Sequence, residues 1–434
     1  MKLIQKLPGK RVALAALAVA LLAIGCGSNS KGPGKPVTLK IWKPFADSGQ
    51  IQPLLSAYQT AHPNVQFEYT EKGIDDYESN LINALASGNG PDIFSINNSW
   101  LPKYIDKIAP APDNVFTYKD YSDAFVDVAA QDFTKDNKVY GTALSVDSIA
   151  LYYNKDILGT VGIATPPKTW NDLSLDVRKI TRQDQTGYFS RSGVAIGTSQ
   201  NVDRSADILY LMMLQAGAIP WSADGLNPQF AQQVQKNGNY ISPGQTALDF
   251  YTSFANPNSA NYTWNTRSDY SIDAFANGRA AMLYSYSYAR QLILAKAPNL
   301  NFGVAPVPQE NLDDPAVNYS NFFGEVVNKQ SKNADVAWDF LKFITSKDSL
   351  DKFYATNKQA SSRRDLIEKQ INDPEIGVFA HANLTAKSFY KPDEGKQDAI
   401  FTGMIDNVIL KGMRIPDALN QAESQATTLT QVRD

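Results

Sequence analysis

Hydrophobic and polar residues alternate along residues 37–43 and 65–73, the pattern of half-buried β-strands. Between these two stretches, apolar residues recur at helical spacing over residues 51–62. A second amphipathic helix is expected over residues 75–88, and a short apolar strand over residues 91–97. This order of strand, helix and strand predicts a mostly parallel sheet that is covered by helices.

The later part of the chain is predicted to contain several helices and few strands. Helical spacing recurs over residues 206–217, 243–255, 333–346, 397–411 and 415–429. Residues 302–308 form a strand-like run. The sequence contains no internal repeat, so an α/β domain structure is favoured over a repeat architecture.

The composition is that of an ordinary globular protein. Of the 434 residues, 43% are hydrophobic and 20% are charged, which excludes a disordered, collagenous or coiled-coil chain. The formal net charge of −3 argues against a nucleic-acid partner, because such proteins carry a basic surplus. A single cysteine and two histidines exclude an internal disulfide and leave little room for a metal site. We therefore expect no metal and no cofactor.

The first 25 residues have the pattern of a signal peptide. Four basic residues precede an unbroken apolar run over residues 12–24, which is shorter than the roughly 20 residues of a membrane span. Small residues then lead into Cys26, and this arrangement resembles the bacterial lipobox. The resemblance implies that residues 1–25 are removed, that Cys26 is acylated, and that residues 26–36 form a flexible tether. The alternative is a plain secretory signal with an incidental cysteine.

Sequence motifs for catalysis are missing. The chain has no phosphate-binding loop, dinucleotide fingerprint, HExxH zinc motif or nucleophile elbow. Its many carboxylates could include a glycosidase pair, but no two of them are singled out. Aromatic residues are abundant, with 21 Tyr, 20 Phe and 6 Trp. Aromatic rings can stack on the apolar faces of sugars, and neighbouring polar side chains can bind the hydroxyl groups.

Seven segments in the same order resemble the family 1 extracellular solute-binding proteins of ABC importers. They are PDIFSINNSW (91–100), DNKVYGTALSVD (136–147), ALYYNKDIL (150–158), PPKTWNDL (166–173), FANGRAAMLYSYSYA (275–289), FGVAPVP (302–308) and NADVAWDFLKFITS (333–346). This resemblance runs from about Val37 to the C-terminus. It implies an α/β Venus-flytrap fold: two lobes, each a mostly parallel sheet flanked by helices, with a ligand cleft between them.

The resemblance also implies lobe boundaries and a function. Residues 37–147 and 325–347 would form the first lobe, and residues 148–324 and 348–434 the second. The protein would be a monomeric substrate-binding lipoprotein, not an enzyme, at the outer face of the cell membrane. It would bind a sugar or oligosaccharide and deliver it to ABC permease subunits. The alternatives are the same fold with a glycerophosphodiester or polyol ligand, a lipid-anchored glycoside hydrolase, and a surface adhesin.

Candidate ligand contacts follow from positions that match the family. The first group follows two strands of the predicted first sheet: Trp42, Phe45, Asp47, Asn97, Asn98 and Trp100. The second group follows the GRAAM segment: Tyr286 and Tyr288. The third group lies in predicted turns and polar loops: Trp221, Trp264, Tyr319, Asn321 and Phe322.

Each group also has a purely structural interpretation. Tyr288 stands where the family carries a tryptophan that stacks on sugar, and Tyr286 replaces a glycine, but Tyr284, Tyr286 and Tyr288 could equally line one face of a strand. Asn98 could cap a helix. Trp42 could belong to the core, and Tyr319, Asn321 and Phe322 could form a hydrophobic seam at the hinge.

Overall fold

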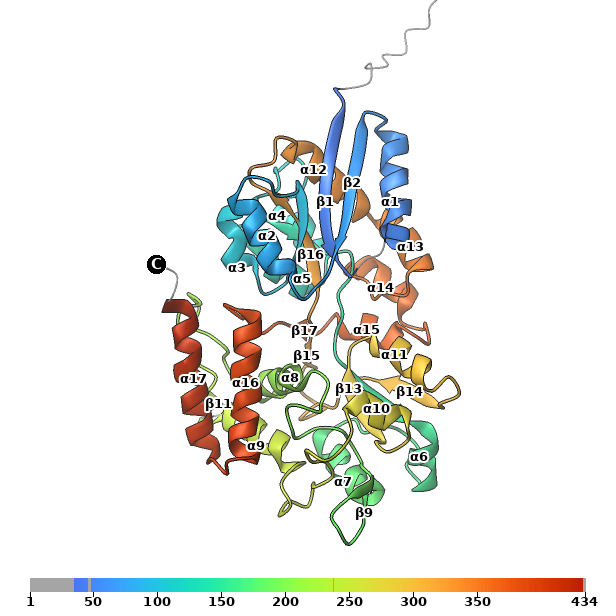
Figure 1. The fold of residues 1–434 in the computed structure, drawn as a ribbon, viewed down its shortest axis with the longest axis vertical. Coiled ribbons are helices and arrows are strands. Elements are labelled where there is room, and N and C mark those ends of the chain that lie inside the picture. Colours follow the sequence, from blue (N-terminus) through green and yellow to red (C-terminus); the bar gives the residue numbers. More distant parts are fainter. Residues whose placement is uncertain (1–34, 46–47, 237, 432–434) are drawn as a thin grey trace, which may run out of the picture.

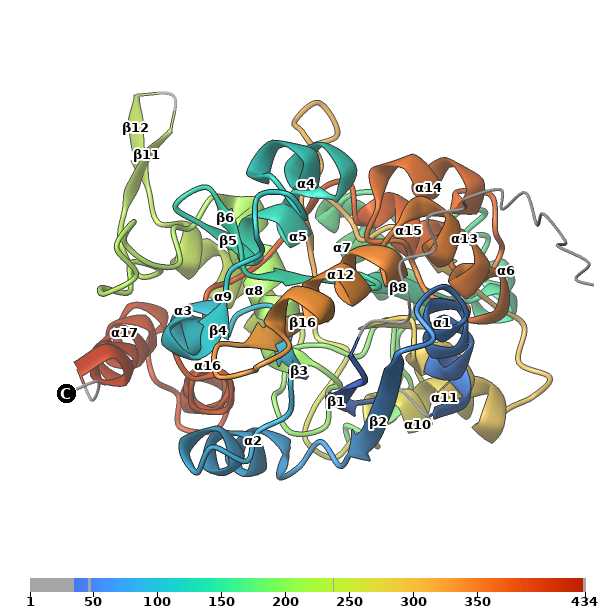
Figure 2. The ribbon, with the colours of Figure 1, turned by 90° about the horizontal axis from the view of Figure 1, so that it is seen from above.

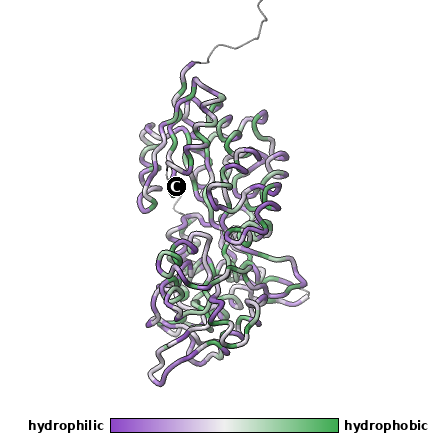
Figure 3. Tube along the Cα trace, turned by 90° about the vertical axis from the view of Figure 1, so that its right-hand side faces the viewer, coloured by the Kyte–Doolittle hydropathy of each residue, from purple (hydrophilic) through white to green (hydrophobic). Residues whose placement is uncertain are grey.

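Two lobes, each with its own sheet, are stacked along the long axis of the molecule (Figure 1). The computed structural model describes residues 35–45, 48–236 and 238–431. The predicted signal peptide, Cys26 and Asp47 lie outside the described residues. Within the described part of the chain, no helix combines the length and the hydrophobicity that crossing a membrane requires. Hydrophobic segments occur in both lobes (Figure 3).

The first lobe is built on one mixed sheet with strand order β2–β1–β3–β16–β4 and β7 beside β16. β1, β2 and β3 run parallel, as the sequence predicts, because α1 (Ser48–Ala61) and α2 (Tyr77–Ala86) carry the chain back between them. Figure 1 shows these helices on opposite sides of β1 and β2. β16 is antiparallel to β3 because the chain enters it from the second lobe. The strands are β1 (Val37–Pro44), β2 (Val65–Lys72), β3 (Ile93–Asn97), β4 (Ile108–Ala109), β7 (Gly141–Thr142) and β16 (Phe323–Asn328).

Short elements and two later helices complete the first lobe. The short elements are α3 (Leu101–Tyr104), η1 (Ile105–Lys107), α4 (Tyr118–Ala124), α5 (Asp127–Asp132) and the hairpin of β5 (Thr134–Lys135) and β6 (Lys138–Val139). α12 (Ala334–Ile344) and α13 (Lys347–Thr356) both contact α1. The predicted boundary after residue 347 is therefore too early, because α13 packs with the first lobe. α14 (Arg364–Gln370) follows it.

The second lobe has an antiparallel three-stranded sheet, which differs from the mostly parallel sheet predicted for it. β8 (Ala150–Asn154) is flanked by β13 (Met282–Ser285) and β14 (Phe302–Ala305), and both run antiparallel to it. β13 and β14 point the same way because α11 (Ala289–Lys296) connects them. The helical crossover is present, but β8 lies between the two strands that it joins.

β13 ends at Ser285, before the last two of the three tyrosines in YSYSY (284–288). The alternative in which three tyrosines share one face of a strand is therefore wrong. Tyr286 follows the strand, and Tyr288 directly precedes α11.

Helices form most of the second lobe. α8 (Ser205–Ala216), α9 (Pro243–Ser253), α16 (Glu394–Ile409) and α17 (Ile415–Gln431) pack against one another. α8 is apolar on nearly every side because it is buried among the others, and it ends at Gly217, whose φ of 90° suits glycine. The remaining helices are α6 (Lys155–Thr160), α7 (Trp170–Ile180), α10 (Ser271–Ala276) and α15 (Gly377–Ala382).

Besides the β5–β6 hairpin, three small strand pairs in the described part of the chain lie outside the main sheets. β11 and β12 form a hairpin that projects from the body (Figure 2). β15 pairs with β17 in parallel beside the junction of the lobes, and β9 pairs with β10. Their bounds are β9 (Arg182–Gln183), β10 (Phe189–Arg191), β11 (Val234–Lys236), β12 (Asn239–Ile241), β15 (Asn318–Tyr319) and β17 (Ala386–Lys387).

The chain passes between the lobes three times, and the passages are bonded to one another. Ser148 forms a backbone bridge with Ser320, and Ser145 forms one with Ser361. The segment before β8 is thereby joined to the segment before β16 and to the segment between α13 and α15. Asn383, which is fully buried, adds side-chain bonds to the first and third passages.

Candidate ligand-binding cleft

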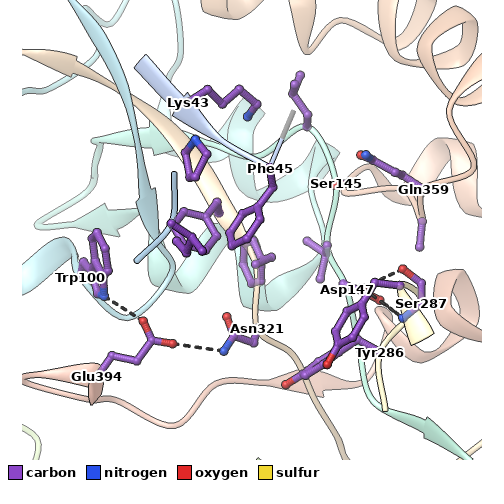
Figure 4. Close-up of a pocket in the computed structure, with 18 of the residues that line it drawn as sticks. Lys43, Phe45, Trp100, Ser145, Asp147, Tyr286, Ser287, Asn321, Gln359 and Glu394 are labelled. Carbon is purple, nitrogen blue, oxygen red and sulfur yellow. Dashed lines mark hydrogen bonds between the residues drawn. The ribbon is translucent and has the colours of Figure 1, made fainter. Parts of the chain in front are cut away.

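A cavity of about 1060 Å³ lies between the lobes and is lined from both of them (Figure 4). The first lobe contributes the end of β1, parts of α1 and α2, and Trp100 directly before α3. The second lobe contributes the turn before α8, the segment after β13 and the first turn of α16. The passages between the lobes supply the rest of the lining, including Asp147, Asn321 and Gln359. A cavity of this volume lies at the upper end of the range for small-molecule sites.

Two aromatic rings in the lining are accessible, one from each lobe. Phe45 is 63% exposed and Tyr288 is 36% exposed. Trp100, Tyr286, Phe322 and Phe353 present little free face, at 6%, 3%, 4% and 6% exposed, and Phe323 is partly buried. Phe45 packs edge-on against Phe323, with ring centroids 5.4 Å apart, and its ring extends into the cavity (Figure 4).

The two tyrosines after β13 are oriented by aspartates at the start of α8. The Tyr288 hydroxyl donates to Asp203 Oδ2 at 2.8 Å, and the Tyr286 hydroxyl donates to Asp207 Oδ2 at 3.0 Å. Burial raises the pKa of Tyr288 to about 12 and that of Tyr286 well above its ordinary value. Both phenols therefore stay neutral at physiological pH. Arg204 Nε donates to the Tyr288 hydroxyl at 3.2 Å.

Asp147 connects the first passage between the lobes to the segment after β13. Its Oδ2 accepts a hydrogen bond from Ser287 Oγ at 2.7 Å, and the Ser287 backbone N–H also points at the carboxylate. Burial raises the pKa of this carboxyl to about 6, against the opposing effect of the Ser287 bonds and of the Arg204 charge.

Glu394, in the first turn of α16, joins the two lobes at one end of the cavity (Figure 4). Its carboxylate accepts from Trp100 Nε1 at 3.2 Å and from Asn321 Nδ2 at 3.3 Å. Behind it, the buried Lys391 ammonium lies 2.9 Å from Asp398 and 3.4 Å from Asp207. One cation thus serves several carboxylates, so negative charge remains at this wall.

The cavity lining as a whole is acidic. Among the described residues of the lining, two are basic, Lys43 and Arg204, and Lys43 pairs with the buried Glu325 carboxylate. The carboxylates of the lining are Asp75, Glu78, Asp147, Asp203, Glu394 and Asp398. The described residues contain no cluster of three or more His, Cys, Asp or Glu side chains suited to hold a metal ion.

The structure brings part of the predicted contact set into the cavity lining. The predicted residues found there are Phe45, Trp100, Tyr286, Tyr288, Asn321 and Phe322. Two further predicted residues support the lining without belonging to it. Asn97 donates to Asn321 Oδ1 at 2.7 Å, and Asn98 donates to Asp132 Oδ2 at 2.7 Å.

The other predicted contacts that the structure describes lie away from the cavity. Trp42 is covered by Lys72, whose ammonium lies 3.9 Å from the ring centroid. Trp264 is a core residue that donates to Asn201. Tyr319 is buried with its ring centroid 5.8 Å from that of Tyr210, and Trp221 packs edge-on against Tyr390. For these four side chains the positions correct the expected placement, because packing within a lobe takes up their rings.

Several polar lining residues were not among the predicted contacts, and Asp147, Arg204 and Glu394 are three of them. Asp147 ends a segment that matches the family, which was the one available signal. Arg204 sits in the polar stretch NVDRSAD before an apolar helix, and Glu394 sits in the polar stretch KPDEGK. Neither stretch differs from an ordinary loop until the fold places it at the cavity.

A two-lobed α/β fold with a lined cavity at the junction of the lobes defines a class of binding protein. The sequence profile of the bacterial extracellular solute-binding proteins matches residues 54–376. The chain belongs to this family, as the resemblance of its motifs predicts.

The relatives and solved structures with which this chain shares similarity include sugar-binding proteins. The maltodextrin-binding protein MdxE of Bacillus subtilis is 24% identical over 389 residues, covering 84% of each chain. The maltotriose-binding protein of Pyrococcus abyssi is 22% identical over 374 residues, covering 83% of this chain and 74% of its own. The structure of the cyclic α-maltosyl-1,6-maltose-binding protein of Arthrobacter globiformis superimposes with a TM-score of 0.76 at 18% identity, covering 91% of this chain and 99% of its own. The two-lobed fold is thereby confirmed.

The raised pKa of Asp147 predicts a pH-dependent contribution to stability. Between pH about 4 and about 6 the folded protein holds a proton that the unfolded chain has lost, so the free energy of unfolding falls as the pH rises through this window. Asp147→Asn removes the titrating group. We expect the variant to gain stability relative to wild type as the pH rises from 4 to 6, with a constant difference above pH 6.

Urea unfolding at a series of pH values measures this difference. Asp113→Asn, at an exposed position, is the control and should show no such pH-dependent gap. A stability difference between wild type and Asp147→Asn that is the same at pH 4 and pH 8 would contradict the prediction.

Proposed function

We propose that this protein is the substrate-binding component of an ABC importer and captures a neutral sugar or oligosaccharide between its lobes. The observation that carries this proposal is the pair of accessible rings, Phe45 and Tyr288, which face one cavity from opposite lobes. Sugar rings have apolar faces and hydroxyl edges, so they suit a site with aromatic faces and polar groups beside them. The maltotriose- and maltodextrin-binding relatives support the same ligand class.

Hydroxyl partners lie next to these rings. Asp147, Asp203 and Glu394 offer carboxylate acceptors in the lining, and Arg204 offers donors. Hydrogen bonds within the protein orient the three carboxylates. Ser287 donates to Asp147, Tyr288 donates to Asp203, and Asn321 donates to Glu394. Preorganised polar groups of this kind lose little freedom when they bind a ligand, which favours affinity.

The charge of the cavity argues against the alternative ligands. A glycerophosphodiester such as glycerophosphoglycerol is an anion, and the described residues of the lining include six carboxylates and two basic side chains. Like charges at a partly buried site would oppose its binding. A linear polyol has no ring face to place against Phe45 or Tyr288. A neutral saccharide fits both the charge and the aromatic surfaces.

The proposed mechanism is capture by closure of the lobes, without turnover. A ligand that contacts both walls binds the closed arrangement more tightly than the open one, and so shifts the population towards it. The closed, loaded protein would then meet the permease subunits. The bonded passages between the lobes would serve as the hinge, because they keep the floor of the cavity in place while the walls approach each other.

We also propose that the mature protein is a monomer anchored by an acylated Cys26 at the outer face of the cell membrane. The supporting observations are the 13 apolar residues from Val12 to Ile24 and the single cysteine that follows small residues. The Gly/Pro-rich residues up to Pro36 would keep the cleft clear of the lipid surface.

The sugar-binding proposal predicts thermal stabilisation by a saccharide. A ligand that binds only the folded state adds about 2.7 kcal/mol to stability at a concentration of 100 Kd. We expect at least one member of a panel of maltotriose, mannotriose, galactotriose, arabinotriose and their monosaccharides to raise the Tm. Glycerophosphoglycerol, which is an anion, and sorbitol serve as matched polar controls. A Tm that none of the saccharides raises, or that glycerophosphoglycerol alone raises, would contradict the proposal.

The anchor proposal predicts the behaviour of Cys26→Ser. Without the thiol no acyl chain can be attached, so the variant should carry no palmitate label and appear either as a released protein outside the detergent phase or as an unprocessed precursor. Phase partition of metabolically palmitate-labelled cells measures this outcome. Ser28→Ala is the control and should partition as wild type. A Cys26→Ser protein that is processed and still enters the detergent phase would disprove acylation at this residue.

A further inference from the structure

Two residues of the cavity lining hold left-handed backbone conformations that large side chains rarely adopt. Phe45 has a φ of 62° and Arg204 a φ of 55°. The other non-glycine residues with positive φ among the described residues are Asp136 and Asn137, between β5 and β6. Asp and Asn tolerate this conformation in turns, whereas it is strained for a residue such as Phe. Phe45 and Arg204 do not share the tolerance of Asp and Asn for this conformation, and both line the same cavity, one in each lobe.

Phe45 uses this conformation to present a ring at the first-lobe wall. It directly follows Pro44, the last residue of β1, and its ring extends towards the middle of the cavity (Figure 4). The ring touches Phe323 by an edge-to-face contact and is otherwise largely open, at 63% exposed. In the protein without ligand, burial of the phenylalanine ring therefore does not offset the free-energy cost of the strained backbone.

Arg204 is the corresponding residue of the second lobe. It precedes α8, and its guanidinium carbon lies 5.7 Å from the ring centroids of both Tyr286 and Tyr288. Its Nε donates to the Tyr288 hydroxyl, which fixes one edge of the planar group. Among the described residues, the two terminal nitrogens donate no hydrogen bond and no carboxylate oxygen lies within ion-pair distance. Arg204 is therefore an exposed, oriented fork with free donors at the cavity wall.

We propose that Phe45 and Arg204 are the specificity-determining pair of the cleft. Phe45 stacks on the apolar face of one sugar ring, and the terminal nitrogens of Arg204 donate to two vicinal hydroxyls of the same saccharide. Backbone strain persists where the surrounding structure holds it, and it concentrates at ligand clamps. This inference rests on the proposed saccharide-binding function and names the residues that determine which sugar is bound.

The surroundings of Arg204 favour hydroxyls over a carboxylate as the acceptor. Asp203 lies in the same wall, Asp147 lies in the floor of the cavity, and further negative charge remains around Lys391. A uronate would bring another negative charge into this environment, whereas a neutral vicinal diol would not. The pair therefore selects a neutral ring with adjacent free hydroxyls over its uronic acid counterpart.

Glycine and alanine variants separate the strain from the side chain. Both substitutions remove the side chain, but only glycine adopts the left-handed conformation without steric cost. We expect Phe45→Gly and Arg204→Gly to unfold at higher temperature than Phe45→Ala and Arg204→Ala in the absence of ligand. All four variants should bind the best trisaccharide of maltotriose, mannotriose, galactotriose and arabinotriose more weakly, on the order of tenfold. Differential scanning calorimetry and isothermal titration calorimetry provide the two readouts.

Two further variants make the comparison specific. Asp136→Gly and Asp136→Ala form the matched control, because Asp136 has a φ of 50° but lies outside the cavity lining. The glycine variant should again be the more stable of this pair, and both should bind the sugar as wild type does. Arg204→Lys keeps the charge but not the planar fork, so it should lose affinity on the order of tenfold as well.

The outcomes distinguish this inference from the proposed function. Wild-type protein that binds none of the four trisaccharides would overturn both. Wild-type protein that binds one of them, with the Phe45 and Arg204 variants binding equally well, would overturn the specificity pair alone. Equal apo stability of the glycine and alanine variants would show that the backbone is not strained at Phe45 and Arg204, and would remove the observation that identified the pair. Full affinity in Arg204→Lys would overturn the role of the fork.

Discussion

The buried side chain of Asn383 is the constraint on which the relative position of the two lobes depends. Its Nδ2 donates to the backbone carbonyls of Val146 at 2.8 Å and Ser361 at 3.1 Å, and its Oδ1 accepts from Ser148 Oγ at 2.7 Å. One amide thus links the first and third passages between the lobes. A buried carbonyl or hydroxyl that lost its partner would cost about 1–3 kcal/mol, so these bonds hold the passages in register.

Because these passages also line the cavity, the hinge and the ligand site are parts of one structure. Asp147 follows Val146 in the first passage, and Asn321 follows Ser320, which is bridged to Ser148. The floor of the cavity is therefore fixed by backbone bonds, while Phe45 and Arg204 belong to the walls of separate lobes. Such an arrangement suits a ligand that is held on two sides. It explains how a site without a metal cluster among its described residues can gain affinity, namely by preorganisation and closure.

The sequence predicted the first sheet well because its strands and helices alternate locally. β1, α1, β2, α2 and β3 all occur where hydrophobic periodicity places them. The sheet of the second lobe was mispredicted because its neighbours are distant in sequence: β8 inserts between β13 and β14, and no local pattern reports an insertion. The distance in sequence between neighbouring residues also explains which site residues were predicted and which were missed. Phe45 and Tyr288 were found beside recognisable strands, whereas Arg204 and Glu394 acquire a role only when tertiary structure brings polar loops to the cavity. Trp264 and Trp42 were predicted to contact the ligand, but packing against other parts of the protein keeps them out of the cavity lining.

Small-angle X-ray scattering tests most directly whether a saccharide closes the two lobes around the bonded passages. The measurement compares apo protein with protein saturated by the trisaccharide of highest affinity, followed by chromatography of the recovered sugar. Closure without turnover predicts a smaller radius of gyration that saturates at the calorimetric stoichiometry, with the sugar recovered unchanged. Scattering curves that are identical with and without bound sugar, or conversion of the sugar by substoichiometric protein, would contradict capture by lobe closure.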